Sequence, residues 1–262
     1  MIETRYLRKT FKTQTVLDGV SFRIENGESV AIIGRSGGGK SVLLKHLIGL
    51  LQPDSGEVLI DGENIVTMDE RQLIRVRRKF GMLFQNSALF DSMTVAENVA
   101  FGLRRHEHLT ESEIEKKVAH ALEVVDLPGT QNKQPSELSG GMRKRVGLAR
   151  AIVYEPRIVL YDEPTTGLDP IVSDSIDELM EAVRDRLQVT TVIVTHDMRS
   201  ARRLGQHVIM LNRGKIHANG PPEEIFNSQD PIIRQFVDGV ADPKESLAIQ
   251  ADFSTDFTKK VR

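Results

Sequence analysis

The chain contains a glycine-rich segment whose residue types and spacing suit the binding of phosphate. Residues 34–41 read Gly-Arg-Ser-Gly-Gly-Gly-Lys-Ser and fit the pattern G-x-x-x-x-G-K-[ST]. Glycines let successive backbone N–H groups turn toward an anion, and a helix that starts after them adds the positive end of its dipole. The predicted phosphate-binding residues are Gly34, Arg35, Ser36, Gly37, Gly38, Gly39, Lys40 and Ser41.

The sequence on either side of the glycines supports this interpretation. Residues 30–33 form an apolar run typical of a strand, and residues 42–51 have the pattern of an apolar helix. Lys40 would hold the β- and γ-phosphates of ATP, and the Ser41 hydroxyl would bind Mg²⁺. A flexible glycine loop that happens to contain a lysine is the alternative, but it does not explain a strand and a helix on the correct sides.

A pair of carboxylates follows a second apolar run, residues 158–161. Ligands of open α/β sheets bind at the carboxyl ends of the strands, where Asp162 and Glu163 would lie. Asp162 would support Mg²⁺ through the water shell of the metal, and Glu163 would act as the general base on the attacking water. Surface carboxylates that cap a strand are the alternative, and the phosphate loop favours the catalytic interpretation.

Two further polar residues close apolar runs and so fall near the same edge of the sheet. His196 follows residues 191–195, and a neutral imidazole there could hydrogen-bond the γ-phosphate or the water. Gln85 follows residues 82–84, and its amide could reach Mg²⁺ and the water. A histidine at a strand end is more often structural and a single glutamine says little, so both roles depend on the other motifs.

A second glycine motif lies far along the chain. Residues 138–142 read Leu-Ser-Gly-Gly-Met and introduce a helix expected over residues 143–153. A helix start that contains glycine makes a second anion site. Because one chain needs a single cradle for the phosphates of ATP, the second site indicates a composite site formed with another copy of the chain.

The remaining pattern predicts an α/β fold that positions these residues. Short apolar runs alternate with longer helical segments, which is typical of a mostly parallel sheet covered on both faces. The first residues and residues 57–60 are expected to form antiparallel edge strands. Tight turns are expected at residues 61–62 and 212–214. The expected buried strands are residues 29–33, 158–161, 191–195 and 208–211.

The helical pattern also predicts the division into domains. Between residues 86 and 155 no strand-like run occurs, and residues 111–125 form an amphipathic helix. We therefore predict an ATP-binding core of residues 1–86 and 156–242, a helical subdomain of residues 87–155, and a polar C-terminal tail of residues 243–262.

Composition narrows the classes of function. The 262 residues carry a net charge of −2, which argues against a nucleic-acid-binding protein. The absence of cysteine excludes disulfides and thiolate chemistry. No apolar run approaches the roughly 20 residues of a membrane helix, and the N-terminus lacks the layout of a secretory signal. We expect a soluble, cytoplasmic protein.

With these motifs in this order, the chain resembles the ABC ATPases over nearly its whole length. The family arranges a P-loop, a Q-loop, a signature, a Walker B strand, a D-loop and a switch histidine in this sequence. Here they correspond to residues 34–41, Gln85, residues 138–142, residues 158–163, residues 166–169 and His196. The resemblance implies a P-loop NTPase (RecA-like) core with an antiparallel β edge and a helical ABC subdomain.

The resemblance also implies an assembly. Two copies would form a head-to-tail homodimer, each ATP lying between one P-loop and the partner's signature residues Ser139, Gly140 and Gly141. Phe11 would stack on adenine, and Asp169 of the D-loop would line the site. The dimer would drive a polytopic membrane permease, which would contact residues 86–101 through the apolar side chains of Leu89, Phe90 and Met93. The alternative for these three is packing inside the helical subdomain.

Three positions depart from the usual family pattern. Met142 replaces glutamine, Phe11 replaces the commoner tyrosine, and Gly38 replaces a frequent serine. None of the three removes a phosphate ligand or the base, so the resemblance implies an active ATPase.

A narrower resemblance concerns the transported substrate. Residues 138–150, 82–90 and 234–239 resemble the branch that serves MCE-associated lipid transporters, which includes the Mla phospholipid system. That branch implies phospholipid transport that maintains outer-membrane lipid asymmetry, from the cytoplasmic face of the inner membrane. It also implies an MCE-domain lipid-binding subunit and a small STAS-domain protein as partners.

Several alternatives have distinct sequence signatures. ATPases of amino-acid importers or lipoprotein exporters share every ATPase motif, and only the branch resemblance argues against them. Soluble ABC ATPases of DNA repair or translation carry a long coiled coil or two heads, and neither feature occurs here. Residues 132–135 lack the aspartate of a guanine-reading motif, which argues against a GTPase. A catalytically inactive subunit is disfavoured because Lys40, Asp162, Glu163 and His196 are all present.

Two basic runs remain, residues 75–79 and 143–145. We expect solvated helix faces, since long charged side chains rarely lie in a core. Contacts with lipid headgroups or with loops of a permease are the alternative.

Overall fold

The computed structural model describes residues 1–107 and 109–240. Met1–Pro222 forms one compact unit, and the described residues from Glu223 onward belong to a second. The predicted C-terminal tail of residues 243–262 lies outside the described residues. The predicted helical subdomain lies inside Met1–Pro222, and so does the predicted core apart from residues 223–242. The division of this unit into a core and a helical subdomain stays a prediction.

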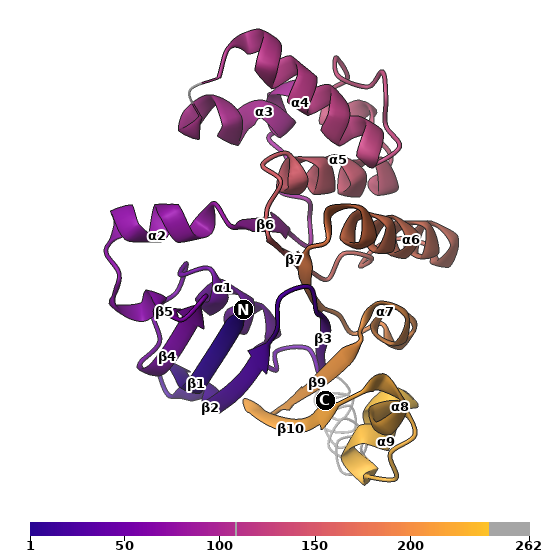
Figure 1. Cartoon of the computed structure of the whole chain (residues 1–262). Helices are drawn as coiled ribbons and strands as arrows, with labels where there is room; N and C mark the ends of the chain where they lie inside the picture. The colour runs from indigo at the N-terminus through magenta and orange to yellow at the C-terminus, as the bar shows by residue number, and fades with distance from the viewer. Residues whose placement is uncertain (108, 241–262) are drawn as a thin grey trace, which may run out of the picture. The chain divides into compact units, whose positions relative to one another are not determined.

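A six-stranded sheet, in the order β10-β9-β3-β8-β7-β6, forms the centre of the first unit (Figure 1). The strands β9, β3, β8, β7 and β6 are parallel, and β10 pairs with β9 antiparallel. Every residue of β3, β7 and β8 is buried, as a sheet covered on both faces requires. Their bounds are β3 Ser29–Gly34, β6 Phe80–Leu83, β7 Ile158–Asp162, β8 Thr190–Val194, β9 His207–Asn212 and β10 Lys215–Gly220.

Antiparallel strands form a second sheet of four, in the order β2-β1-β4-β5. The strands are β1 Ile2–Phe11, β2 Gln14–Ile24, β4 Ser55–Ile60 and β5 Glu63–Asn64. The sequence pattern does not predict β2, because Asp18 and Gly19 interrupt its apolar alternation. The expected tight turns are present: Asp61 and Gly62 both have positive φ, as do Arg213 and Gly214.

Helices cover the sheets and enclose two apolar clusters. Alternate residues of one strand serve both clusters: Val159 and Tyr161 face one, and Ile158 and Leu160 face the other. The first cluster includes residues of α3 to α6, and the second includes α1 and the antiparallel sheet. The bounds are α1 Lys40–Leu47, α2 Glu70–Arg77, α3 Val95–His106, α4 Glu111–Val124, α5 Gly140–Ile152, α6 Pro170–Leu187, α7 Met198–Leu204, α8 Pro222–Phe226 and α9 Pro231–Val237. Two short 3-10 helices span Ile65–Thr67 and Pro135–Glu137.

Two helices differ from the sequence prediction at one end. The helix after the glycines ends at Leu47 instead of residue 51, because Gly49 adopts a left-handed conformation with φ of 65°. The helix of the second glycine motif begins at Gly140 instead of residue 143, because Ser139 caps it. The glycines of that motif therefore belong to the first turn of α5.

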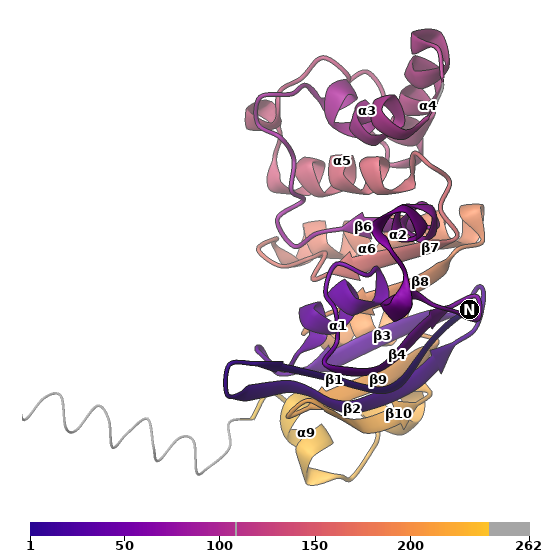
Figure 2. The same cartoon turned by 90° about the vertical axis from the view of Figure 1, so that its left-hand side faces the viewer.

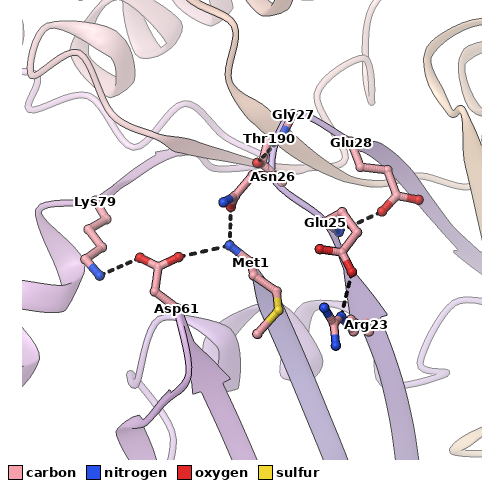
Figure 3. Close-up of polar contacts among 9 residues, drawn as sticks. All are labelled: Met1, Arg23, Glu25, Asn26, Gly27, Glu28, Asp61, Lys79 and Thr190. Carbon is pink, nitrogen blue, oxygen red and sulfur yellow. Dashed lines mark hydrogen bonds and ion pairs between the residues drawn. The ribbon is translucent and has the colours of Figure 1, made fainter.

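A polar network joins the two sheets at the amino ends of the parallel strands (Figure 3). The Gly27 N–H, in the turn between β2 and β3, donates to Thr190 Oγ1 at 2.8 Å at the start of β8. Lys79, just before β6, donates to Asp61 Oδ2 at 2.6 Å and holds the pKa of Asp61 below its usual value. These contacts lie at the end of the sheet opposite the phosphate loop, which follows the carboxyl end of β3.

In residues 1–107 and 109–240 we find no helix with the length and apolar composition of a membrane span.

Candidate active site

The phosphate loop connects the buried strand β3 to helix α1. No side chain caps the first N–H groups of α1, so they remain for an outside acceptor. In contrast, side chains cap the helices α2, α3, α4, α6 and α7. The phosphate loop thus suits an anion because the N–H groups at the start of α1 have no side-chain cap.

Packing requires glycine at the two ends of the loop. Gly34 has φ of 146°, and a Cβ there would lie 2.2 Å from the Leu211 carbonyl oxygen. Gly39 has φ of 94°, and a Cβ there would lie 2.7 Å from the Val16 carbonyl oxygen. Around Gly37, by contrast, no atom lies within 4 Å of a Cβ position. The loop is therefore tightly packed at both ends, and Gly37 between them has free space around it. At Gly38 a Cβ would lie 2.8 Å from the Arg35 carbonyl oxygen, so this position is also restricted.

Lys40 places a buried ammonium inside this cradle. The residue is 5% exposed, and Nζ donates to the carbonyl oxygens of Gly34 at 2.7 Å and Arg35 at 3.0 Å. Burial lowers the pKa of Lys40, while the nearby charges of Asp162 and Glu163 act in the opposite direction. These hydrogen-bond acceptors are neutral, so the positive charge is available to an anionic phosphate.

Ser41 and Asp162 lie together, as the predicted magnesium site requires. Ser41 Oγ donates to Asp162 Oδ1 at 2.8 Å, and Asp162 is 8% exposed. Burial raises the pKa of Asp162, and the Ser41 hydroxyl partly offsets that effect. Within the part of the chain that the structure describes, no three His, Cys, Asp or Glu side chains form a metal cluster. The donors fit an ion that takes most of its ligands from a nucleotide and water.

Glu163 is the point where the predicted catalytic residues meet. Around its Oε2 atom lie Thr166 Oγ1 at 2.9 Å, His196 Nδ1 at 3.2 Å and Gln85 Nε2 at 3.4 Å. Glu163 also has φ of 48°, a left-handed conformation that costs about 1–3 kcal/mol outside glycine. The structure therefore brings Glu163, His196 and Gln85 together, and the strained backbone of Glu163 sets the position of its carboxylate.

Lys144 corrects the expectation of a solvated face for residues 143–145. It is 5% exposed, and Nζ donates to the backbone carbonyl oxygens of Gln85 and, at 3.4 Å, of Glu163. Burial lowers its pKa, and the charge of Glu163 opposes that shift. The signal was available in the sequence, because Lys144 shares a helix face with Gly147 and Leu148, both buried.

The run at residues 75–79 meets this expectation only in part. Arg75 and Arg78 are exposed, whereas Arg77 and Lys79 are half-buried, and Arg77 Nε donates to the Ile48 carbonyl oxygen at 3.1 Å. Arg75 pairs with Glu63 at 2.5 Å, and side-chain exposures of 63% and 43% place this pair at the surface. Such a pair contributes little to stability.

The second glycine motif packs on the start of α6. Ser139 Oγ accepts a hydrogen bond from the Met142 N–H at 3.3 Å. A Cβ on Gly141 would lie 2.7 Å from Val172 Cγ1, so α5 and α6 approach closely. In both views α5 and α1 lie apart, with β6 and β7 between them in Figure 1 (Figures 1 and 2). The structure thus does not join Ser139, Gly140 and Gly141 to the phosphate loop of their own chain.

Phe11 and Asp169 are the two remaining predicted nucleotide contacts. Phe11 is the last residue of β1 and is 42% exposed, and Lys9 Nζ lies 5.5 Å from the centroid of its ring. Asp169 Oδ1 accepts from the N–H groups of Ile171 and Val172, each at 3.0 Å, and so caps α6. The nucleotide contacts that the family resemblance implies for Phe11 and Asp169 stay predictions.

A cavity of about 400 Å³ adjoins His196 and Thr166, and it contains a buried acid that the sequence did not single out. Asp177 is 4% exposed, and its Oδ2 accepts from Ser200 Oγ at 2.6 Å. Its Oδ1 has no hydrogen-bond partner among the described residues. Burial raises the pKa of Asp177 to about 6.

Asp177 should make stability depend on pH. Between roughly pH 4, where an exposed aspartate ionises, and about pH 6, the folded chain keeps a proton that the unfolded chain has released. The free energy of unfolding should therefore fall as the pH rises through this window. Asp177→Asn should flatten the fall in thermal melts between pH 4 and pH 8, and Asp185→Asn, at an exposed site, should not. Equal slopes for wild type and Asp177→Asn would contradict the assignment.

Comparison with known proteins shows which proteins the chain is similar to. The family model described as "ABC transporter" matches residues 17–166. MlaF of Escherichia coli K12, an intermembrane phospholipid transport system ATP-binding protein, is 40% identical over 92% of this chain and 90% of its own length. The probable ribonucleotide transport ATP-binding protein mkl of Mycobacterium leprae is 43% identical over 91% of this chain. The aligned region spans 69% of that protein, and 66% of its Mycobacterium tuberculosis counterpart.

Solved structures of ATP-binding cassettes have a similar fold. The dimeric post-hydrolysis structure of the ATP-binding cassette MJ0796, bound to ADP and Pi, superposes with a TM-score of 0.78 at 33% identity. It covers 85% of this chain and 99% of MJ0796. CbiO1 of Clostridium perfringens, part of the complex cbiONQ, superposes with a TM-score of 0.80 at 30% identity, covering 95% of this chain and 98% of CbiO1. The α/β fold predicted from the sequence is confirmed.

Proposed function

This chain belongs to the ABC transporter ATPases, and from that premise we propose that it hydrolyses ATP with Mg²⁺ as one of two identical subunits that drive phospholipid transport. The observation that carries the catalytic part is the meeting of Gln85, His196 and Thr166 at the carboxylate of Glu163. The phospholipid part rests on the 40% identity to MlaF along nearly the whole of both chains.

In this proposal each side chain has a defined role in hydrolysis. Lys40 and the uncapped N–H groups of α1 would bind the phosphates, and Ser41 and Gln85 would hold Mg²⁺, with Asp162 acting through a water molecule. Mg²⁺ would neutralise charge on the β- and γ-phosphates. Glu163 accepts a proton from the attacking water, and His196 orients the carboxylate and the γ-phosphate. The three contacts on Glu163 Oε2 hold the carboxylate in one orientation relative to the attacking water.

The proposal places the second half of each site on a second copy. Ser139, Gly140 and Gly141 would bind the γ-phosphate held by the partner's loop, because a helix N-terminus favours anions. The dimeric MJ0796 structures, at 33% identity, support a second copy as the partner. We further place the dimer at the cytoplasmic face of the inner membrane, beside an MCE-domain subunit and a STAS-domain protein.

An exposed aromatic pair is the proposed contact with the permease. Phe90 and Phe101 are 42% and 36% exposed, and their ring centroids lie 4.7 Å apart. The fully buried Asn98 holds this loop, accepting from the Phe90 N–H at 2.8 Å and donating to its carbonyl oxygen at 3.1 Å. Leu89 instead is partly buried against the first apolar cluster, and Met93 is half-buried. The permease contact is therefore assigned to the two phenylalanines.

Isolation from native membranes tests the proposal. The wild type, purified in mild detergent, should recover a polytopic permease, an MCE-domain protein and phospholipid, identified by mass spectrometry. A double variant, Phe90→Ser with Phe101→Ser, should lose these companions because the apolar contact is removed. Tyr6→Ser is the matched control, since Tyr6 is an exposed aromatic residue on β1 at 76% exposure.

Other results of this isolation would contradict parts of the proposal. Recovery of a different permease with a solute-binding protein and no lipid would keep the ATPase and overturn the lipid assignment. A ribonucleotide in place of lipid would favour the second candidate, for which the 43% identity to the mycobacterial protein is the supporting observation. Full retention of the permease by the phenylalanine double variant would remove the proposed contact surface.

A further inference from the structure

Lys144 is a buried cation whose contacts are two backbone carbonyls of the ATP site. It lies in the second turn of α5, four residues after Gly140, and donates to the carbonyl oxygens of Gln85 and Glu163. Both of those residues point their side chains at one another, Gln85 Nε2 lying 3.4 Å from Glu163 Oε2. One ammonium therefore holds the main chain of two residues that would face the attacking water.

The Glu163 main chain is held from both sides. Its N–H donates to the Val194 carbonyl oxygen at 2.9 Å, and its carbonyl oxygen accepts from Lys144 at 3.4 Å. Between these contacts the residue keeps a left-handed φ of 48°, which a residue with a side chain adopts only when its surroundings impose it. Loss of the Lys144 contact should free this backbone and reorient the carboxylate.

The helix that carries Lys144 also carries the residues for the other ATP site. Ser139 caps α5, and Gly140 and Gly141 form its first turn. The helix sits tightly on β6, because a Cβ on Gly147 would lie 2.8 Å from Leu83 Cδ1. A displacement of the start of α5 must therefore move Lys144, since one turn of hydrogen-bonded helix separates them.

We propose that Lys144 couples the two ATP sites of the dimer, by joining the helix that meets the partner's nucleotide to the carbonyls of Gln85 and Glu163 at its own. The inference rests on the proposed head-to-tail function. Engagement of Ser139 by the partner's γ-phosphate positions α5, and Lys144 transmits that position to the base. By linkage, nucleotide at the chain's own site favours the same position of α5.

Lys144 is a positioning residue, so its test needs more than a rate. The full-length chain is assayed for ATP hydrolysis over a range of ATP concentrations, and ADP binding is measured by calorimetry at dilutions where the chain is monomeric. The wild type should show a Hill coefficient approaching two, the number of coupled sites. Lys144→Met, which keeps the stem and removes the donor, should lower the Hill coefficient to about one. It should also reduce turnover by about 3- to 30-fold, while ADP affinity changes by less than about threefold because the phosphate loop is untouched.

Matched variants separate coupling from loss of structure. Lys144→Arg retains a charged donor and should keep a Hill coefficient above that of Lys144→Met. Lys116→Met, at an exposed site on α4, should match the wild type. If thermal melts show that Lys144→Met does not fold, Lys144→Gln takes its place, with the same expected loss of cooperativity.

The other possible results separate the role of Lys144, the coupling between the sites and the proposed function. A folded Lys144→Met or Lys144→Gln with the wild-type Hill coefficient overturns the role of Lys144 and leaves the proposed function intact. Wild-type hydrolysis with a Hill coefficient of one overturns coupling between the sites altogether. Wild-type chain that binds ADP and never hydrolyses ATP overturns the proposed function itself.

Discussion

Replacing Glu163 with glutamine should lower the rate of ATP hydrolysis by about 100- to 10,000-fold, the usual contribution of a general base, and should leave ATP binding unchanged. The amide cannot accept the proton of the attacking water. It can still accept the hydrogen bond from Thr166 Oγ1, so the local packing is preserved. Binding should persist because the ammonium of Lys40 and the uncapped start of α1 are unaffected.

Glu155→Gln is the matched control for this change. Glu155 is also a left-handed glutamate, with φ of 54°, but its side chain is 70% exposed and pairs with Lys117. Its turnover should equal that of the wild type in a phosphate-release assay. Glu163→Gln turnover within a factor of two of the wild type would remove Glu163 from the role of base.

Replacing Ser139 with arginine should reduce hydrolysis by about 100- to 1,000-fold, the usual loss when a charge-stabilising donor is removed. The bulky cation would fill the helix start where the partner's γ-phosphate is proposed to bind. ATP affinity of the isolated monomer should stay within about twofold, because α5 and α1 lie apart in the chain (Figures 1 and 2). Equilibrium binding of a fluorescent ATP analogue and a phosphate-release assay measure the two quantities.

The loss of a helix cap needs its own control. Ser139 accepts from the Met142 N–H, and removal of such a cap costs about 1 kcal/mol of stability. Thr110→Arg removes the cap of α4 in the same way, away from the proposed site. If Thr110→Arg lost as much activity as Ser139→Arg, the effect would reflect destabilised helices and not a shared ATP site.

Much of the catalytic geometry could be predicted because it follows from chain order. The strands β3 and β7 end in Gly34 and Asp162, and parallel strands place their carboxyl ends at one edge. Gln85, Glu163 and His196 each follow a strand of the same sheet, so their meeting is a consequence of topology. The turns at residues 61–62 and 213–214 followed from local residue types.

Other features depend on contacts between distant segments, and sequence periodicity does not reveal these. The helix face of Lys144 indicated its burial, but its two carbonyl partners, Gln85 and Glu163, lie 59 and 19 residues away in the chain. Asp177 and Ser200 meet across α6 and α7, 23 residues apart in the chain. The strand β2 was hidden by Asp18 and Gly19, and its pairing with β1 is a tertiary outcome.

The most direct test of the account is the mass of Glu163→Gln with and without ATP, measured by light scattering. A chain that binds ATP without hydrolysing it should change from one chain of 29.3 kDa to a dimer of twice that mass, because each nucleotide then joins a phosphate loop to the partner's Ser139. Adding Ser139→Arg to Glu163→Gln should keep the chain monomeric at the same ATP saturation. A Glu163→Gln chain that stays at 29.3 kDa with ATP bound, or a double variant that dimerises equally well, would contradict a composite site.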